Sequence, residues 1–251
     1  MRYSVDGGRV RGRELKQMTD FRSGPSFQHL RHLDDDGELV EALLACVKQV
    51  KAAADRFTSG HHRDANALEH VSEKALESAM QRGDVSDIRT EGELSNCLVF
   101  HTSGLAGSVI DATVMQLRER VDELVRERIC QLITGPPRAD LLVSGHLFYP
   151  PGGYMGWHTN SRVPGWRIYV TYAEEPGKSF FRYRDPGTGE VVTSWDDGWD
   201  LRAFSAERKR PFWHSVYSDT NRFSFGYRLV PEGSDRRRGI VRRVLRRLLR
   251  S

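Results

Sequence analysis

Five short runs of β-branched and aromatic residues in the second half of the chain limit its possible folds most. The runs are LLVSGHLFY, WRIYVTY, KSFFRYR, EVVTSW and RFSFGYRLV. Residues that favour turns bound them, as in YPPGG, EEPGK, DPGTG and SDTN. DPGTG between two of the runs predicts a β-hairpin. Strands this short and this regularly interrupted favour an antiparallel barrel or double-sheet jelly roll over a parallel sheet.

The first half of the chain has the periodicity of helices instead. Apolar residues recur at helical spacing after the acidic run 34–36 and continue to about residue 57. A shorter helix is expected over 67–80, and a third over about 108–133, where TGPP ends it. Residues 1–33 show no sustained period and are expected to be irregular.

These patterns predict an α+β fold in which N-terminal helices buttress a C-terminal jelly roll. The expected division is a helical supporting region over 1–139, a jelly-roll core over 140–230 and a basic tail over 231–251. With 38% hydrophobic and 10% aromatic residues, the chain of 251 residues can bury a substantial core.

The positive charge is concentrated at the C-terminus. The whole chain has a net charge of +4, but residues 231–251 hold eight arginines against Glu232 and Asp235, a net +6. Residues 1–230 therefore carry −2, which argues against a nucleic-acid groove in the core. Residues 236–250 predict a basic amphipathic helix suited to an anionic membrane, a nucleic-acid backbone or a partner's groove. The alternative is that its leucine face packs on its own domain or on a second subunit.

Other classes of protein are disfavoured by what the composition lacks. Cys46, Cys97 and Cys130 are too few and too far apart for a disulfide framework or a zinc cluster. The sequence contains no run of about 18 apolar residues, so no membrane span is predicted. The N-terminus lacks the apolar run of a signal peptide. A soluble, cytoplasmic protein is expected.

Two histidines in the strand-rich half are the candidates for chemistry. His158 lies in GGYMGWHTN and His214 in RPFWHSVYS. Two imidazoles from different strands with a nearby oxygen ligand suit a mononuclear iron site with open positions. Arg222 and Arg228 are six residues apart, so they share one face of a strand, and Tyr149 ends the strand before His158. The alternative is that the histidines have a purely structural role.

Residues 141–230 resemble the Fe(II)/2-oxoglutarate-dependent dioxygenases, whose double-stranded β-helix is a jelly roll. The resemblance implies that His158 and His214 are the two histidine ligands of Fe(II). It implies that Arg222, with Ser224 two residues later, receives the far carboxylate of 2-oxoglutarate. Tyr149, nine residues before His158, and the Arg222/Arg228 pair are similar to the nucleic-acid demethylase branch. The cofactors implied are Fe(II), 2-oxoglutarate and O₂.

The sequence departs from the family pattern at Asn160, where the motif has an aspartate or glutamate. A carboxylate is an anionic donor to Fe(II), whereas an amide offers a neutral carbonyl oxygen. Four interpretations follow: Asn160 is a weak metal ligand, the position holds water or halide as in the halogenases, another carboxylate replaces it, or the site is inactive. The replacements considered are Asp185, Asp196, Asp197 and Asp200.

The expected activity is hydroxylation of a small molecule or a pendant group, coupled to decarboxylation of 2-oxoglutarate to succinate. The alternatives are a catalytically degenerate jelly-roll binding protein and a halogenase-like variant without the carboxylate ligand. A further group of arginines near the cavity suits either an anionic substrate or solvent-facing strand positions, and the solvent-facing interpretation is favoured. The group comprises Arg162, Arg167, Arg182 and Arg184.

Overall fold

The computed structural model describes residues 26–31, 37–57, 64–83, 95–102, 109–133 and 139–231. The helices are α1 (Gly37–Phe57), α2 (Glu73–Arg82) and α3 (Ala112–Ile133), with a 3-10 turn η3 (Glu69–Val71). The strands of the first half are β1 (Phe27–Arg31), β2 (Ser95–Asn96) and β3 (Leu98–Val99). Those of the second half are β4 (Ala139–Tyr149), β5 (Gly153–His158), β6 (Gly165–Ala173), β7 (Ser179–Arg184), β8 (Val191–Trp195), β9 (Trp199–Ala206), β10 (His214–Ser218) and β11 (Arg222–Pro231).

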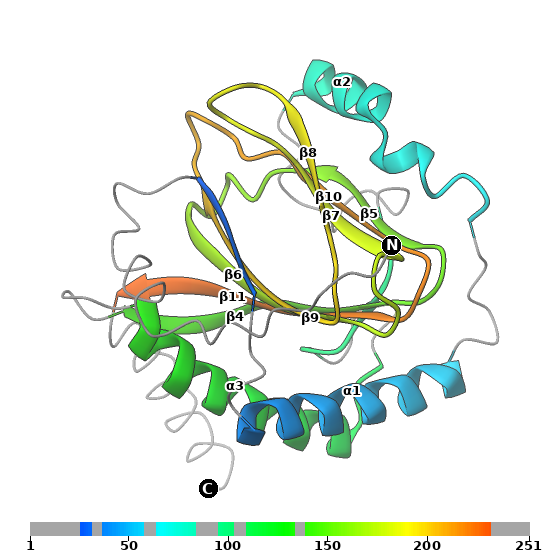
Figure 1. The fold of residues 1–251 in the computed structure, drawn as a ribbon, viewed down its shortest axis with the longest axis vertical. Coiled ribbons are helices and arrows are strands. Elements are labelled where there is room, and N and C mark those ends of the chain that lie inside the picture. Colours follow the sequence, from blue (N-terminus) through cyan, green and yellow to red (C-terminus); the bar gives the residue numbers. More distant parts are fainter. Residues whose placement is uncertain are drawn as a thin grey trace, which may run out of the picture.

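Two antiparallel sheets face each other across a shared interior (Figure 1). One has the strand order β1-β9-β6-β11-β4-β3, and the other has the order β2-β5-β10-β7-β8. Strands distant in sequence are neighbours in both sheets, as expected for a jelly roll. The predicted α+β class, a jelly roll with supporting helices, is confirmed.

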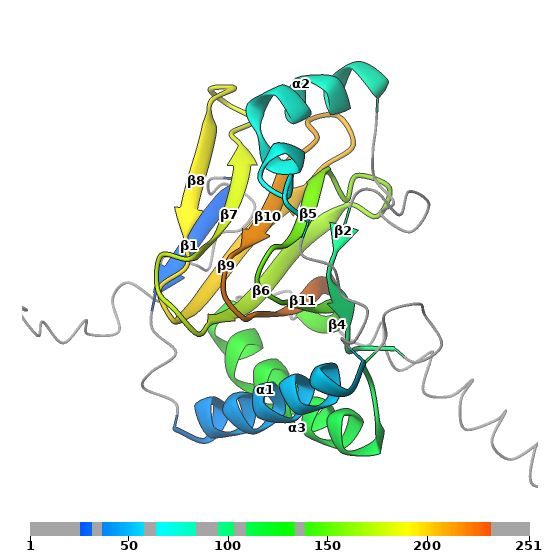
Figure 2. The same cartoon turned by 90° about the vertical axis from the view of Figure 1, so that its right-hand side faces the viewer.

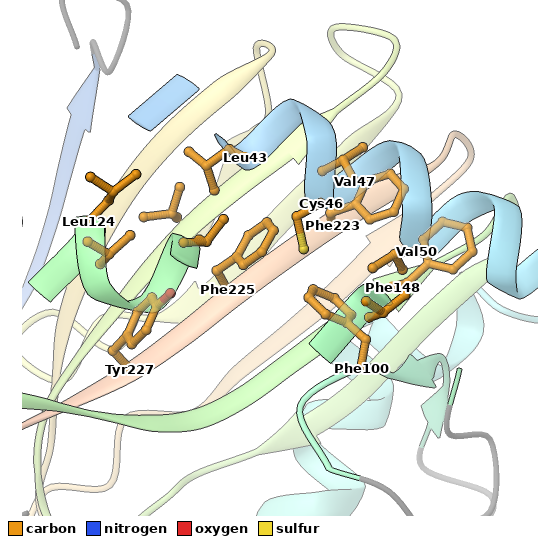
Figure 3. Close-up of a cluster of buried hydrophobic side chains, with 14 of the residues drawn as sticks. Leu43, Cys46, Val47, Val50, Phe100, Leu124, Phe148, Phe223, Phe225 and Tyr227 are labelled. Carbon is orange, nitrogen blue, oxygen red and sulfur yellow. The ribbon is translucent and has the colours of Figure 1, made fainter. Parts of the chain in front are cut away.

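Alternation along β11 explains how one strand serves both faces of its sheet. Phe223, Phe225 and Tyr227 are buried in the apolar cluster beneath α1 and α3 (Figure 3). Arg222 and Ser224, at the intervening positions, point into the interior between the sheets and line its cavity. Successive strand residues point to opposite faces, so one run supplies both the helix-packing core and the cavity wall.

The helices supply the other half of this core. In Figure 3, Leu43, Val47 and Val50 of α1 lie over the aromatic side chains of the sheet, and Leu124 of α3 lies beside them. All four are at most 5% exposed. Full burial of an aliphatic side chain of this size contributes roughly 1.5–3 kcal/mol relative to exposure. The amphipathic helices are therefore held on the outer face of the sheet by apolar burial.

A buried polar network also joins α3 to the sheet. Asp122 of α3 accepts hydrogen bonds from His146 Nε2 at 2.8 Å, Tyr227 Oη at 2.9 Å and Arg118 Nη1 at 2.7 Å. His146 Nδ1 accepts a hydrogen bond from the backbone N–H of Gly226 at 3.1 Å. Because Asp122 and His146 both bond to groups of the sheet, the network also holds α3 in position on it.

The second sheet is covered on its outer side by α2 and η3 (Figure 2). Ser72 is the N-cap of α2, and its side chain accepts a hydrogen bond from Ala75 N. The backbone carbonyl of Ser72 accepts a hydrogen bond from Trp157 Nε1 at 2.7 Å. This contact fixes the segment of β5 that leads into His158.

Three strands come from the region expected to be helical or irregular. The interpretation of residues 1–33 as irregular is wrong for 27–31, because β1 pairs with β9 along its whole length. Strands β2 and β3 also join the sheets, and β9 itself was not among the predicted runs. The domain division at residue 139 stays a prediction, and the tail 232–251 lies outside the described residues.

Among the helices of the described ranges, none has the length and apolar character needed to cross a membrane.

Candidate active site

The two candidate histidines meet although 56 positions separate them in sequence. His158 ends β5 and His214 begins β10, and the two residues are direct register partners in the antiparallel pair. Their ring centroids are 3.9 Å apart, and both side chains are buried. The strand register therefore brings the two candidate histidines together.

Each imidazole is fixed in the tautomer that a metal ligand needs. His158 Nδ1 donates to the carbonyl of Gly156 at 2.9 Å, and His214 Nδ1 donates to the carbonyl of Phe212 at 3.0 Å. A carbonyl only accepts, so the proton is on Nδ1 and the lone pair is on Nε2 in both rings. Burial lowers the pKa of His158 to about 4. Burial and the neighbouring His158 hold the pKa of His214 well below its usual range, so both rings are neutral at pH 7.

Asn160 lies beside this pair. Its amide nitrogen donates to His214 Nε2 at 3.2 Å. Its backbone is in the left-handed region, with a φ of 36°, which asparagine tolerates better than most residues. The turn after β5 thus directs the amide back toward the histidines.

None of the replacement carboxylates considered from the sequence joins the histidines. The described residues contain no group of three or more histidine, cysteine or acidic side chains placed to hold a metal ion. Asp196 and Asp200 instead form ion pairs with Arg202. Among the candidates for the third ligand, the amide of Asn160 is therefore the one that lies beside the histidine pair.

A buried guanidinium lies at the other end of the interior. Arg222 begins β11 and is 1% exposed, and its Nε donates to Asp196 Oδ2 at 2.8 Å. Its Nη1 is buried and has no hydrogen-bond partner. A buried donor without an acceptor costs free energy, so this atom is suited to receive an oxygen of a ligand.

Asp196 holds two arginines at once. Arg202 Nη1 donates to its Oδ1 at 2.6 Å, and Ser179 Oγ donates to the oxygen that Arg222 contacts. Burial alone would raise the pKa of this carboxyl, but Arg222 and Arg202 lower it to about 2. Sequence reasoning considered Asp196 only as a metal ligand and did not find Arg202. The alternation in WDLRAFSA is the signal that could have placed Arg202 on the inward face.

A small cavity joins the histidine pair to Arg222. It has a volume of about 20 Å³, which is room for one or two water molecules. Its lining includes Tyr149 and Ser224 from the prediction, and also Tyr169, Thr171 and Arg202, which sequence reasoning missed. The ring of Tyr149 lies 5.3 Å from the guanidinium carbon of Arg222.

Of the predicted residues, Asn160 contacts His214 without lining this cavity. Arg228 does not line it either. It is six positions beyond Arg222 on β11, where it is the register partner of Arg167 on β6. Arg167 is 4% exposed, so its interpretation as a solvent-facing residue is wrong.

The sequence matches no protein-family model and no curated protein. Solved structures that resemble the fold include a prolyl-4-hydroxylase from Pseudomonas putida, with a TM-score of 0.43 and 11% identity over 87% of this chain and 99% of that chain. A prolyl hydroxylase from Trichoplax adhaerens, in complex with a hypoxia-inducible-factor peptide, has a TM-score of 0.45 and 15% identity over 87% and 90%. A 2OG-Fe(II) oxygenase family oxidoreductase from Burkholderia pseudomallei has a TM-score of 0.39 and 12% identity over 63% and 78%. These likenesses are weak, and the functional argument rests on the site.

Proposed function

We propose that this protein is an Fe(II)- and 2-oxoglutarate-dependent oxygenase that acts on a small molecule. One observation carries the proposal: a single interior has two neutral histidines with unprotonated Nε2 atoms at one end and a guanidinium with an unpartnered Nη1 at the other. The two histidines suit a divalent metal, and the guanidinium suits a carboxylate of a cosubstrate.

The donor set fits Fe(II), although with one neutral oxygen in place of a carboxylate. His158 and His214 would hold the ion through Nε2. Asn160 would contribute its amide oxygen after the amide turns over, because its nitrogen now faces His214. When bound, Fe(II) supplies the redox chemistry that couples decarboxylation of 2-oxoglutarate to oxidation of a second substrate by O₂.

Arg222 would bind the far carboxylate of the cosubstrate. Asp196 holds its Nε, so Nη1 is directed by a fixed contact and does not have to be ordered by the ligand. Ser224, two residues along the same inward face, lines the same wall and would add a hydroxyl. Because the cavity is small, the cosubstrate would enter only after apolar lining residues such as Leu147 and Met155 move aside.

Aromatic side chains pack around the histidines and shield this end of the interior from bulk solvent. Phe204 and Phe181 have ring centroids 4.7 and 5.4 Å from that of His214. A dry pocket strengthens the electrostatic contacts within it and protects reactive species from side reactions.

Anaerobic titration with Fe(II) and 2-oxoglutarate tests the proposal. We expect a metal-to-ligand charge-transfer band, followed by succinate formation when O₂ is admitted. His214→Ala should abolish the band, whereas His70→Ala, a change to a half-exposed histidine of the α2 face, should leave it intact. No band at millimolar iron in the wild-type protein would refute the oxygenase function.

The second candidate is a jelly-roll protein that binds a ligand without catalysis. The hydrogen bond from Asn160 to His214 favours it, because that bond occupies the lone pair a metal would need. Under this alternative, 2-oxoglutarate would stabilise the protein through Arg222 without any band or succinate. A halogenase-like variant has no specific support, since the Asn160 amide lies where a halide would bind.

A further inference from the structure

Three arginines are buried in the described part of the chain, and one of them lacks a carboxylate partner. Arg202 and Arg222 both pair with Asp196. Arg167 is 4% exposed and forms no ion pair with any described residue. Its Nη2 donates to the backbone carbonyl of Val163, while its Nη1 is buried without a hydrogen-bond partner.

An unpaired guanidinium in this setting is unfavourable. Burial lowers the pKa of Arg167, and the positive charge of Arg228 lowers it further. The loss of hydration is usually offset by an ion pair or a complete set of hydrogen bonds. Here a single carbonyl contact is present, so an anion from outside the described residues would complete the site.

Arg167 lies on the inward face of its sheet, far along the strands from Arg222. It shares the inward face of β6 with Tyr169 and Thr171, which line the cavity. The β6–β11 register pairs Arg167 with Arg228, and it pairs Ala173 with Arg222. Six residues of strand span roughly 20 Å, so the two guanidinium groups with an unpartnered Nη1 belong to opposite ends of the interior.

Arg167 is also connected to the turn that carries Asn160. The carbonyl of Val163 accepts from Arg167, and the backbone N–H of Val163 donates to the carbonyl of Asn160 at 3.1 Å. Asn160 in turn donates to His214, so this turn links the guanidinium to the histidine pair. A group bound at Arg167 would therefore lie on the histidine side of the interior, away from the cosubstrate end.

We propose that Arg167, with Arg228 as its cross-strand neighbour, anchors an anionic group of the substrate, a carboxylate or a phosphate. The inference rests on the proposed function, because the anchored molecule is the one oxidised at the histidine pair. It narrows the substrate class to small anionic molecules. A guanidinium recognises both oxyanions through paired N–H donors.

Anion binding to the full-length protein without iron tests this inference separately from the enzyme activity. Benzoate and inorganic phosphate are titrated by calorimetry, with thermal stability as a second readout. We expect at least one of them to bind and to raise the Tm. Benzoate binding would indicate a carboxylate substrate, and phosphate binding would indicate a phosphorylated one. Arg167→Met should weaken the binding about 10- to 100-fold, as expected for the loss of a charge-assisted contact.

Matched variants separate this site from other sources of anion binding. Arg210→Gln removes an exposed arginine and should leave the affinity unchanged. Arg222→Gln should abolish 2-oxoglutarate binding but retain the benzoate or phosphate affinity. Arg167→Lys keeps the charge without the paired donors and should have an intermediate affinity.

The same variants exclude a purely structural role for Arg167. Without an anion, Arg167→Met should unfold at the same or a higher temperature than the wild type, because it removes an unpaired buried charge. The inference is overturned if neither anion binds the wild type, or if binding persists in Arg167→Met. Either result leaves the iron charge-transfer test of the oxygenase function unaffected.

Discussion

Asp196 Oδ2 lies 2.8 Å from Arg222 Nε, in a place where both side chains are at most 1% exposed. The contact uses the side of the guanidinium that faces away from the open donor, so Nη1 is left without a partner. Because the other oxygen of Asp196 holds Arg202, one carboxylate positions two cationic groups of the cavity wall. Asp196 is thus a positioning residue for the expected cosubstrate site.

Removal of the Asp196 charge should destabilise the fold. Asp196→Asn would leave Arg202 and Arg222 in the interior with one negative charge fewer, and breaking a buried ion pair costs about 3–5 kcal/mol. Urea denaturation should show this loss in the free energy of unfolding. Asp197→Asn, at the exposed neighbouring position, is the matched control and should change stability by less than about 0.5 kcal/mol. Similar stabilities for the two variants would contradict the role assigned to Asp196.

Asp196 should also make the stability depend on pH in the acid range. The pKa of its carboxyl is lowered from 3.8 to about 2 in the folded protein. A lowered folded-state pKa adds stability above the unfolded value, so the contribution is complete above about pH 4 and is lost as the pH falls toward 2. The difference corresponds to about 2 kcal/mol. Denaturation curves at pH 5 and pH 2.5 should show a smaller acid effect in Asp196→Asn than in the wild type, and equal effects would refute this assignment.

Restoring the carboxylate at position 160 should strengthen metal binding. Asn160→Asp replaces a neutral amide beside His214 with an anionic oxygen donor, which a hard divalent ion prefers. Calorimetric titration with Mn(II) as a redox-inert probe should give a Kd lower by about tenfold or more, equivalent to roughly 1.4 kcal/mol. Asn160→Ala is the comparison variant and should bind no more tightly than the wild type. Unchanged affinity in Asn160→Asp would show that this position does not face the metal.

Two glycines that face each other on β4 and β11 should respond differently to alanine. A Cβ at Gly226 would lie 2.5 Å from the carbonyl oxygen of Gly145 and 2.8 Å from Tyr169 Cε1, whereas a Cβ at Gly145 meets nothing within 4 Å. Gly226→Ala should therefore lower the free energy of unfolding by about 1–3 kcal/mol, as overpacking does. Gly145→Ala should be neutral or slightly stabilising, since alanine restricts the unfolded chain. Thermal unfolding of both variants decides the point, and equal Tm values would contradict the close approach at Gly226.

The helices and most of the strands were predictable because their signals are local. The apolar spacing along residues 39–54 reflects the helical period, and RFSFGYRLV alternates between two faces of a sheet. Strand β9 was missed because Asp200 and Arg202 make its sequence read as polar. Both side chains are buried in the structure, since they are paired with each other and with His29 or Asp196.

The residues of the candidate site also fall into those that the sequence could predict and those that it could not. The resemblance in sequence identified His158, Asn160, His214, Tyr149, Arg222 and Ser224, and the structure brings them to one interior. Arg228 does lie on the same face of β11 as Arg222, but six residues away, so it does not reach the cavity. Two residues on one face of a strand can still lie far apart along it. The buried state of Arg167 and the pairing of Asp196 had no local signal.

The sequence alone determined the three helices, most of the strands, the alternation of side chains along those strands and the chemical identity of the histidine and arginine candidates. These properties follow from covalent alternation and side-chain chemistry, which act over a few residues. The tertiary structure decided that His158 meets His214, that Asp196 pairs with both Arg222 and Arg202, and that Arg167 has no described counter-ion. Charges balance through space, so their partners depend on which distant strands become neighbours.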